Sequence, residues 1–326
     1  MIRPAQIGLA CAALLTAVGS QAEPSLTDCA AIDADAARLA CYDRLSGRAE
    51  RRAAESRPSL LTESWELDGN PALFHLRHYK PVYLLPYFHA DKTNPTPTSP
   101  TRGLTSANPA QIDNTEAKFQ LSFKTKILTD IFGSNGDLWG AYTQSSRWQV
   151  YNRDHSRPFR ETNYEPEAMF VWRTKEGILG VKAARYLALG INHQSNGQGG
   201  ALSRSWNRIT GAIAFESGQW TLTLRPWWRV EESGSDDDNP DLADYAGRGE
   251  ILVTRVIDGH VLSLEARHSL HLGSRNHGSL RADWAFPLND RLKGHVQLFN
   301  GYAENLIDYN HRATYLGVGF SLVEWH

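Results

Sequence analysis

An eleven-residue stretch decides the fold: Trp220-Thr-Leu-Thr-Leu-Arg-Pro-Trp-Trp-Arg-Val230. Every second residue, counted from Trp220 to Val230, is apolar, and the positions between them are mostly polar. Successive side chains of a β-strand point to opposite faces, so a period of two predicts a strand with one apolar and one polar face. This stretch therefore predicts a β-strand that lies between an apolar and a polar environment.

The same period recurs along the chain from residue 73 onward. We find twelve such segments, at 73–90, 116–130, 137–152, 164–175, 180–195, 203–217, 219–231, 244–257, 259–271, 277–287, 292–305 and 312–325. Short connections follow segments 2, 4, 6, 8 and 10, and longer polar connections follow segments 1, 3, 7 and 11. An even number of strands with short and long connections in alternation is typical of bacterial transmembrane barrels. We therefore predict an all-β fold, a twelve-stranded antiparallel transmembrane β-barrel over residues 71–326.

Composition excludes other classes of protein. The chain has 326 residues and a net charge of −2, which gives no support for a nucleic-acid partner. Beyond the first two dozen residues, no apolar run approaches the roughly 18–20 residues that a membrane helix needs. The chain ends in Trp325-His326, close to the terminal aromatic residue of many bacterial outer-membrane barrels. A water-soluble β-sandwich or soluble barrel would show the same alternation and remains an alternative.

The N-terminus has the features of an export signal. Residues 1–22 contain one charge, Arg3, then an apolar stretch over residues 7–18 and small residues at Ser20 and Ala22. This pattern predicts a signal peptide that is cut before Glu23 and removes Cys11. We expect residues 23–70 to form a periplasmic extension, partly helical, with a charged linker at residues 50–58.

Two cysteines remain in the expected mature chain, Cys29 and Cys41. A cysteine pair in an exported protein favours a disulfide. One continuous helix would hold them about 18 Å apart, which is beyond disulfide reach. If the disulfide forms, we expect the helix to fold back near residues 33–35 and the bond to be a local structural staple.

Candidate catalytic residues lie on one predicted hairpin. The chain contains no G-x-S-x-G, H-E-x-x-H, Walker or G-x-G-x-x-G motif. His193 and Ser195 continue the apolar face of their strand, and the next strand would return Asn207 beside His193. A lone His-x-Ser seldom has a catalytic role. A base, a nucleophile and an orienting amide on one outward face, beside a Gly-rich turn, favour acyl-transfer chemistry at the outer lipid leaflet.

Several motifs resemble those of the outer membrane phospholipase A family, twelve-stranded barrels of Gram-negative bacteria. The resemblance extends from about residue 118 to the end, and the segment around Cys29 and Cys41 is not part of it. It rests on Ala141-Tyr-Thr-Gln144, Pro158-Phe-Arg-Glu-Thr-Asn-Tyr-Glu-Pro166, Asn192-His193-x-Ser195-Asn196-Gly197, Ser203-Arg-Ser-Trp-Asn207, Asp238-Asn-Pro-Asp241 and Leu306-Ile-Asp-Tyr309.

The resemblance implies a phospholipase A1/A2, with lysophospholipase activity, in the bacterial outer membrane. It implies a Ser195–His193–Asn207 triad and an oxyanion donor at the backbone N–H of Gly197. Ser195 would attack a glycerophospholipid ester to form an acyl-enzyme that water then hydrolyses. A neutral Asn in the third position avoids an anion beside hydrocarbon.

The resemblance also implies a calcium ion and an active homodimer. The calcium ligands would be the Ser203 side chain, the Gln198 carbonyl and the Ser156 carbonyl of a second subunit. Gln198 stands where the family has Arg, a change that a backbone ligand tolerates. Gln144 matches a glutamine that the family uses at its dimer interface. Two other functions remain open at this point: a catalytically silent porin or adhesin barrel, and a barrel lipid A esterase.

Overall fold

The computed structural model describes residues 25–48, 59–68, 73–104, 110–133, 135–174, 177–178, 180–234, 236–289 and 291–323. The expected signal peptide with Cys11, the expected linker at 50–58, and Trp325-His326 lie outside the described residues. The chain divides into two compact units, Met1–Arg57 and Pro58–His326.

The first unit is a pair of short helices, α1 (Leu26–Ala30) and α2 (Asp35–Leu45). A disulfide joins Cys29 and Cys41, whose Cα atoms are 5.4 Å apart, and the chain reverses between the two helices. The expected disulfide and fold-back are therefore confirmed. The two cysteines are the buried residues of these helices. A unit of this size cannot form a sufficient hydrophobic core, so the disulfide holds the two helices together.

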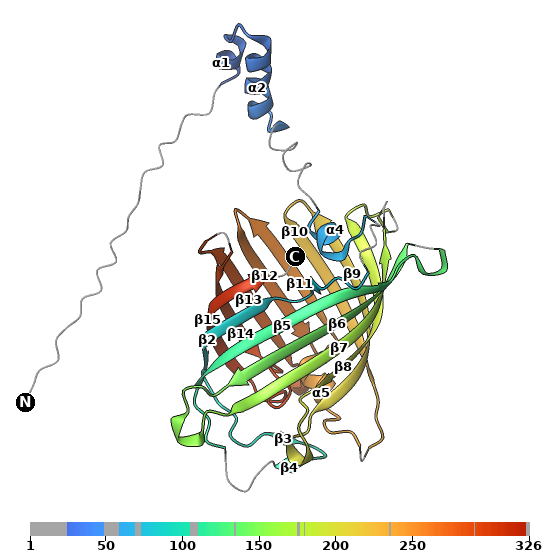
Figure 1. Cartoon of the computed structure of the whole chain (residues 1–326), viewed down its shortest axis with the longest axis vertical. Helices are drawn as coiled ribbons and strands as arrows, with labels where there is room; N and C mark the ends of the chain where they lie inside the picture. Colours follow the sequence, from blue (N-terminus) through green and yellow to red (C-terminus); the bar gives the residue numbers. More distant parts are fainter. Residues whose placement is uncertain are drawn as a thin grey trace, which may run out of the picture. The chain divides into compact units, whose positions relative to one another are not determined.

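The second unit is a closed antiparallel barrel, which confirms the predicted fold class (Figure 1). Each strand pairs with the next, and the last pairs with the first to close the cylinder. The twelve strands of the wall are β2 (Val82–Ala90), β5 (Thr115–Leu128), β6 (Gly136–Trp148), β7 (Phe159–Arg173), β8 (Ala184–Ser195), β9 (Ser205–Ser217), β10 (Trp220–Val230), β11 (Gly249–Ile257), β12 (His260–His268), β13 (Gly278–Pro287), β14 (Lys293–Gly301) and β15 (Ala313–Val323).

Short elements accompany the wall. They are β1 (Arg77–His78), which pairs with β5, the small hairpin of β3 (Thr98–Ser99) and β4 (Gly103–Leu104), and the single-turn 3-10 helices η1 (Ile131–Gly133), η2 (Arg153–His155), η3 (Gly200–Leu202) and η4 (Gly273–Arg275). Within the part of the chain that the structure describes, no helix is long and apolar enough to cross a membrane.

The two faces of the wall differ as the period of two requires. On β10, Trp228 is 60% exposed on the outer face, whereas Trp227 is buried on the inner face. The lumen is filled by buried charged side chains held in ion pairs. Glu304, for example, lies 2.7 Å from both Lys118 and Arg147. Pairing of this kind offsets the cost of removing these charges from water.

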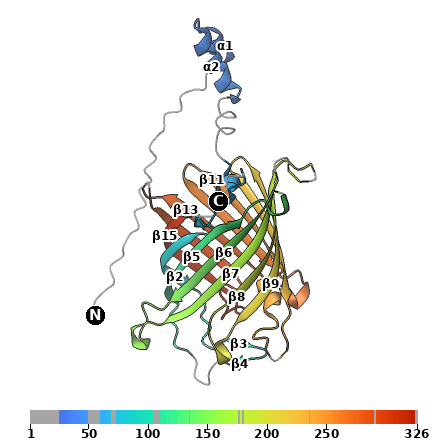
Figure 2. The ribbon, with the colours of Figure 1, turned by 45° about the vertical axis from the view of Figure 1, so that its right-hand side comes forward.

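A helix of the barrel unit, α4 (Leu60–Trp65), packs against the inner wall at the end that carries the short turns (Figure 2). Its apolar residues Leu61 and Trp65 join a buried cluster with wall residues such as Trp139. The carboxylate of Glu216, near the turn between β9 and β10, accepts hydrogen bonds from the backbone N–H groups of Leu60 and Leu61 at the start of the helix. We expected residues 60–65 in the N-terminal extension, but the helix that they form contacts the wall of the barrel.

The opposite end is filled by the long connections. The helix α5 (Leu242–Ala246) packs with Trp206, Trp227 and Tyr309. We expected a strand to begin at residue 244, and it begins at Gly249 because this helical turn precedes it. The sequence pattern missed α5 because five residues are too few to display a helical period.

Candidate active site

The hairpin of β8 and β9 places a histidine beside an asparagine on the outer face of the barrel. His193 and Asn207 are cross-strand partners in the register. The ring Nδ1 of His193 lies 2.8 Å from Oδ1 of Asn207. The amide Nδ2 of Asn207 donates to Oε1 of Glu232, also at 2.8 Å. Because a carboxylate can only accept, this second bond leaves the amide oxygen to face the ring, and Nδ1 of His193 then carries the proton.

Ser195 lies two residues beyond His193, at the end of β8. It faces Tyr164 of β7 and Ser205 of β9 in the register. Among the described residues, the ring of His193 is hydrogen-bonded to Asn207 and not to the hydroxyl of Ser195. Catalytic hydrogen bonds are often loose before substrate binds, so residues at i and i+2 on one face remain a suitable nucleophile and base.

The surroundings of this group are apolar and exposed. Ile191, one position closer to the middle of the strand on the same face, is 66% exposed, and Ile209 of β9 is 43% exposed. His193 is itself exposed. The polar group therefore lies at the edge of a broad apolar surface, where the long loops begin.

The loop after Ser195 is held by one buried side chain, Asn196. Its Oδ1 accepts from the backbone N–H groups of Gln198 at 3.3 Å and Arg204 at 3.0 Å, and its Nδ2 donates to the carbonyl of Leu202 at 2.9 Å. Gly197 has φ +66°, and a Cβ there would lie 3.0 Å from the ring of Tyr164. Glycine is needed here for both reasons, and its backbone N–H stays next to Ser195.

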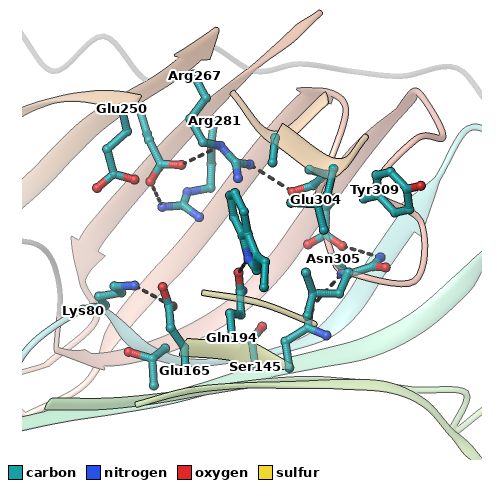
Figure 3. Close-up of a pocket in the computed structure, with 18 of the residues that line it drawn as sticks. Lys80, Ser145, Glu165, Gln194, Glu250, Arg267, Arg281, Glu304, Asn305 and Tyr309 are labelled. Carbon is teal, nitrogen blue, oxygen red and sulfur yellow. Dashed lines mark hydrogen bonds and ion pairs between the residues drawn. The ribbon is translucent and has the colours of Figure 1, made fainter. Parts of the chain in front are cut away.

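The lumen side of the same hairpin is a polar network. Gln194, which points into a luminal cavity of about 120 Å³, accepts a hydrogen bond from Nε1 of Trp206 at 2.8 Å (Figure 3). The guanidinium of Arg208 lies 4.2 Å from the Trp206 ring and pairs with Glu165, which also binds Lys80. These contacts hold the two strands in register directly behind the candidate catalytic residues.

The outer-end loops are joined by strong polar contacts. The hydroxyl of Tyr309 donates to Asp241 at 2.5 Å. Burial and the neighbouring carboxylate raise the pKa of Tyr309 above its ordinary value, so this phenol remains a neutral donor at all physiological pH values.

The expected calcium ligands offer the hard oxygen donors that calcium prefers. Ser203 and Gln198 lie at the two ends of the loop that Asn196 organises, and the hydroxyl of Ser203 donates to Oδ2 of Asp238 at 2.5 Å. With its proton so engaged, the hydroxyl oxygen keeps lone pairs available for a cation. Ser156 lies on a separate exposed loop between β6 and β7. Among the described residues, no cluster of three His, Cys, Asp or Glu side chains could hold a metal.

The expected dimer residue lies in a polar row on the outer face of β6. Gln144 accepts from the hydroxyl of Tyr142 at 3.2 Å and donates to Ser146 at 3.4 Å. Thr162 of β7 extends the row with a hydroxyl contact to Ser146 at 3.1 Å. Polar side chains on an otherwise apolar wall favour contact with another protein surface over contact with lipid.

The sequence analysis did not identify Glu232, Asp238 or Asn196 as members of the site. The Asn-Gly pair at 196–197 was visible as a turn, and Asp238 lies in a quoted motif. Glu232 lies in an acidic loop with no motif, and only the fold brings it to Asn207.

The fold and this surface define the class: an integral β-barrel of the bacterial outer membrane with candidate ester-hydrolase groups on its outer face. The phospholipase A1 family profile matches residues 61–322. Phospholipase A1 of Escherichia coli K12 is 37% identical over 207 residues, which cover 64% of this chain and 69% of that protein. The chain belongs to the phospholipase A1 family and is an outer-membrane phospholipase.

Solved structures agree with this assignment. A Salmonella typhi outer membrane phospholipase dimer with bound calcium matches with a TM-score of 0.68 at 31% identity, over 79% of this chain and 96% of that chain. An active-site mutant of Escherichia coli outer membrane phospholipase A, in which asparagine is replaced by alanine, matches with a TM-score of 0.67 at 31% identity, over 79% of this chain and 95% of that chain.

Proposed function

We propose that this chain is a calcium-dependent phospholipase A1/A2, with lysophospholipase activity, which cleaves acyl esters of glycerophospholipids at the outer leaflet and is active as a homodimer. The observation that carries the proposal is the His193–Asn207 hydrogen bond of 2.8 Å on the exposed apolar face, two residues from Ser195. An esterase that works on membrane lipid needs its nucleophile on this side of the wall.

The residues of the chain account for each step. Ser195 Oγ attacks the ester carbonyl carbon while its proton passes to Nε2 of His193, and the imidazolium then gives that proton to the departing alcohol. The acyl group remains on Ser195 until water, deprotonated by His193, attacks the acyl carbon. The bond to Ser195 Oγ then breaks, the imidazolium returns its proton to Oγ, and the fatty acid leaves. The backbone N–H of Gly197 donates to the carbonyl oxygen as negative charge develops there. Asn207 keeps the ring in the tautomer that leaves Nε2 free.

The proposed metal site consists of the Ser203 hydroxyl, the Gln198 carbonyl and the Ser156 carbonyl of a second copy. Calcium, when bound there, supplies positive charge close to the developing oxyanion. Two observations support this part: the donor oxygens suit calcium, and the related Salmonella protein is described as a dimer with bound calcium. The related Escherichia coli protein is described with an asparagine in its active site, which supports the inclusion of an asparagine in the proposed triad.

The proposal includes the polar row that contains Gln144 as part of the dimer contact. It also includes a signal peptide at residues 1–22 and an N-terminal extension from residue 23, with the barrel unit beginning at Pro58 because α4 packs against the inner wall. The packed lumen, with buried pairs such as Lys118–Glu304, argues against the passive porin alternative.

The test uses the mature chain, refolded in detergent and assayed on mixed phospholipid micelles. We expect release of fatty acid by the wild type with calcium, and loss of release with chelator or in Ser195→Ala. Hydrolysis that persists in Ser195→Ala would reject the triad. An equal rate of hydrolysis with calcium and with chelator would reject the calcium site. Release of acyl chains from lipid A and not from phospholipid would favour the lipid A esterase alternative.

A further inference from the structure

The loop after β10 brings a carboxylate to the far side of Asn207. Val230, the last residue of β10, is the cross-strand partner of Asn207, and Glu232 lies two residues farther along. The result is a chain of two hydrogen bonds, each 2.8 Å long: Glu232 Oε1 to Asn207 Nδ2, and Asn207 Oδ1 to His193 Nδ1.

An asparagine alone is an ambiguous partner for a catalytic histidine. Its amide can turn by 180° and present NH₂ to the ring, and His193 would then accept at Nδ1 and carry its proton on Nε2. In that state Nε2 cannot take the proton of Ser195. Because the Glu232 carboxylate only accepts hydrogen bonds, it stabilises the one amide orientation that leaves Nε2 free.

We propose that Glu232 is a positioning residue of this phospholipase, which acts on His193 through the amide of Asn207. The inference rests on the proposed Ser195–His193–Asn207 triad. It explains how an enzyme with a neutral third residue can still use a carboxylate to orient its histidine.

The location of Glu232 suits this role. It lies in the long loop beyond the strand, is only partly buried, and lines an open cavity of about 460 Å³ with Trp228 and Arg248. A carboxylate in this position remains in contact with water. An aspartate in place of Asn207 would instead put the charge next to the apolar face, where desolvation is costly.

The neighbouring Glu231 offers a matched control, because it carries the same charge one residue away and is exposed. We expect Glu232→Ala to lower kcat about tenfold with KM unchanged, the effect of losing one hydrogen bond to a charged group. Glu232→Gln should recover most of the activity, because its amide oxygen can accept the same bond. Glu231→Ala should match the wild type.

A double-mutant cycle separates this role from a general structural one. In an Asn207→Ala background, Glu232→Ala should cause no further loss. The ¹⁵N signals of His193 give a second readout that does not need turnover: Nδ1 should be protonated in the wild type and both tautomers populated in Glu232→Ala.

Three results would overturn the inference: wild-type kcat in Glu232→Ala, an equal loss in Glu231→Ala, or an equal loss in the Asn207→Ala background. Ser195→Ala is assayed in the same series. If the wild type does not exceed it, the proposed function fails, whereas a normal wild type with unchanged Glu232→Ala rejects only the positioning role.

Discussion

Replacement of Trp65 should detach helix α4 from the inner wall while the barrel stays closed. Trp65 is 6% exposed, and its ring centroid lies 5.0 Å from that of Tyr186 and 5.6 Å from that of Trp139. The ammonium of Lys124 lies 3.5 Å from the centre of the same ring. The helix thus has one large anchor, and the twelve strands pair with one another without it.

The size of the effect follows from these contacts. Truncation of a buried Trp to Ala costs roughly 3–5 kcal/mol, and a desolvated cation–π contact adds about 2 kcal/mol. A loss of about 5 kcal/mol in the docking of α4 changes its docking equilibrium by more than three orders of magnitude. The hydrogen bonds from the start of the helix to Glu216 remain, but they are partly exposed and contribute less.

The assay is limited digestion with proteinase K of refolded protein in detergent, followed by mass spectrometry of the fragments. In Trp65→Ala, cleavage within residues 59–68 should become much faster, and the barrel core should stay resistant. Glu63→Ala is the matched control, because Glu63 is an exposed residue of the same helix. Equal cleavage rates in Trp65→Ala and the wild type would refute the assignment of Trp65 as the anchor.

Two further predictions concern charge and covalent structure. Burial alone would raise the pKa of Glu304, but Arg147 and Lys118 hold the pKa below its ordinary value of 4.5. The ionised Glu304 carboxylate therefore stabilises the folded protein above about pH 5, and this contribution is lost as the pH falls. Glu304→Gln should therefore lower the stability at pH 7 by roughly 3–5 kcal/mol and reduce the difference in melting temperature between pH 7 and pH 3; unchanged melting at both pH values would contradict this. Cys41→Ser removes the disulfide to Cys29 and should lower the free energy of unfolding of the α1–α2 pair by about 3 kcal/mol. Proteolysis within residues 25–48 should therefore become faster in the variant. Reductant should cause the same increase in the wild type and no further increase in the variant.

Much of the fold followed from local patterns. The twelve segments correspond to the twelve wall strands, and the inward and outward faces of β10 are those that its alternation predicts. Strand ends were less accurate: the eighth segment was expected from residue 244 and begins at Gly249 after the short helix α5. The segment 59–68 was assigned to the extension because its six-residue helix carries no distinct pattern, although Trp65 packs inside the barrel.

The candidate site likewise contains residues that the sequence located and one that it could not locate. The placement of His193 and Ser195 on one outward face required only the period of the strand, and Asn207 required one hairpin. Glu232 could not be found in this manner, because its contact with Asn207 depends on the path of a loop of irregular structure.

The sequence by itself determined the number of strands, the face on which each side chain lies and the location of the His193–Ser195 pair, because alternation along a strand is a local property of the backbone. Only the tertiary structure decided the contacts of loop residues and of segments far apart in the chain: Glu216 at the start of α4, Asp238 on Ser203 and Glu232 on Asn207. Such contacts join residues far apart in the chain or lying in irregular loops. Their geometry is set by barrel closure and loop packing, which leave no periodic trace in the sequence.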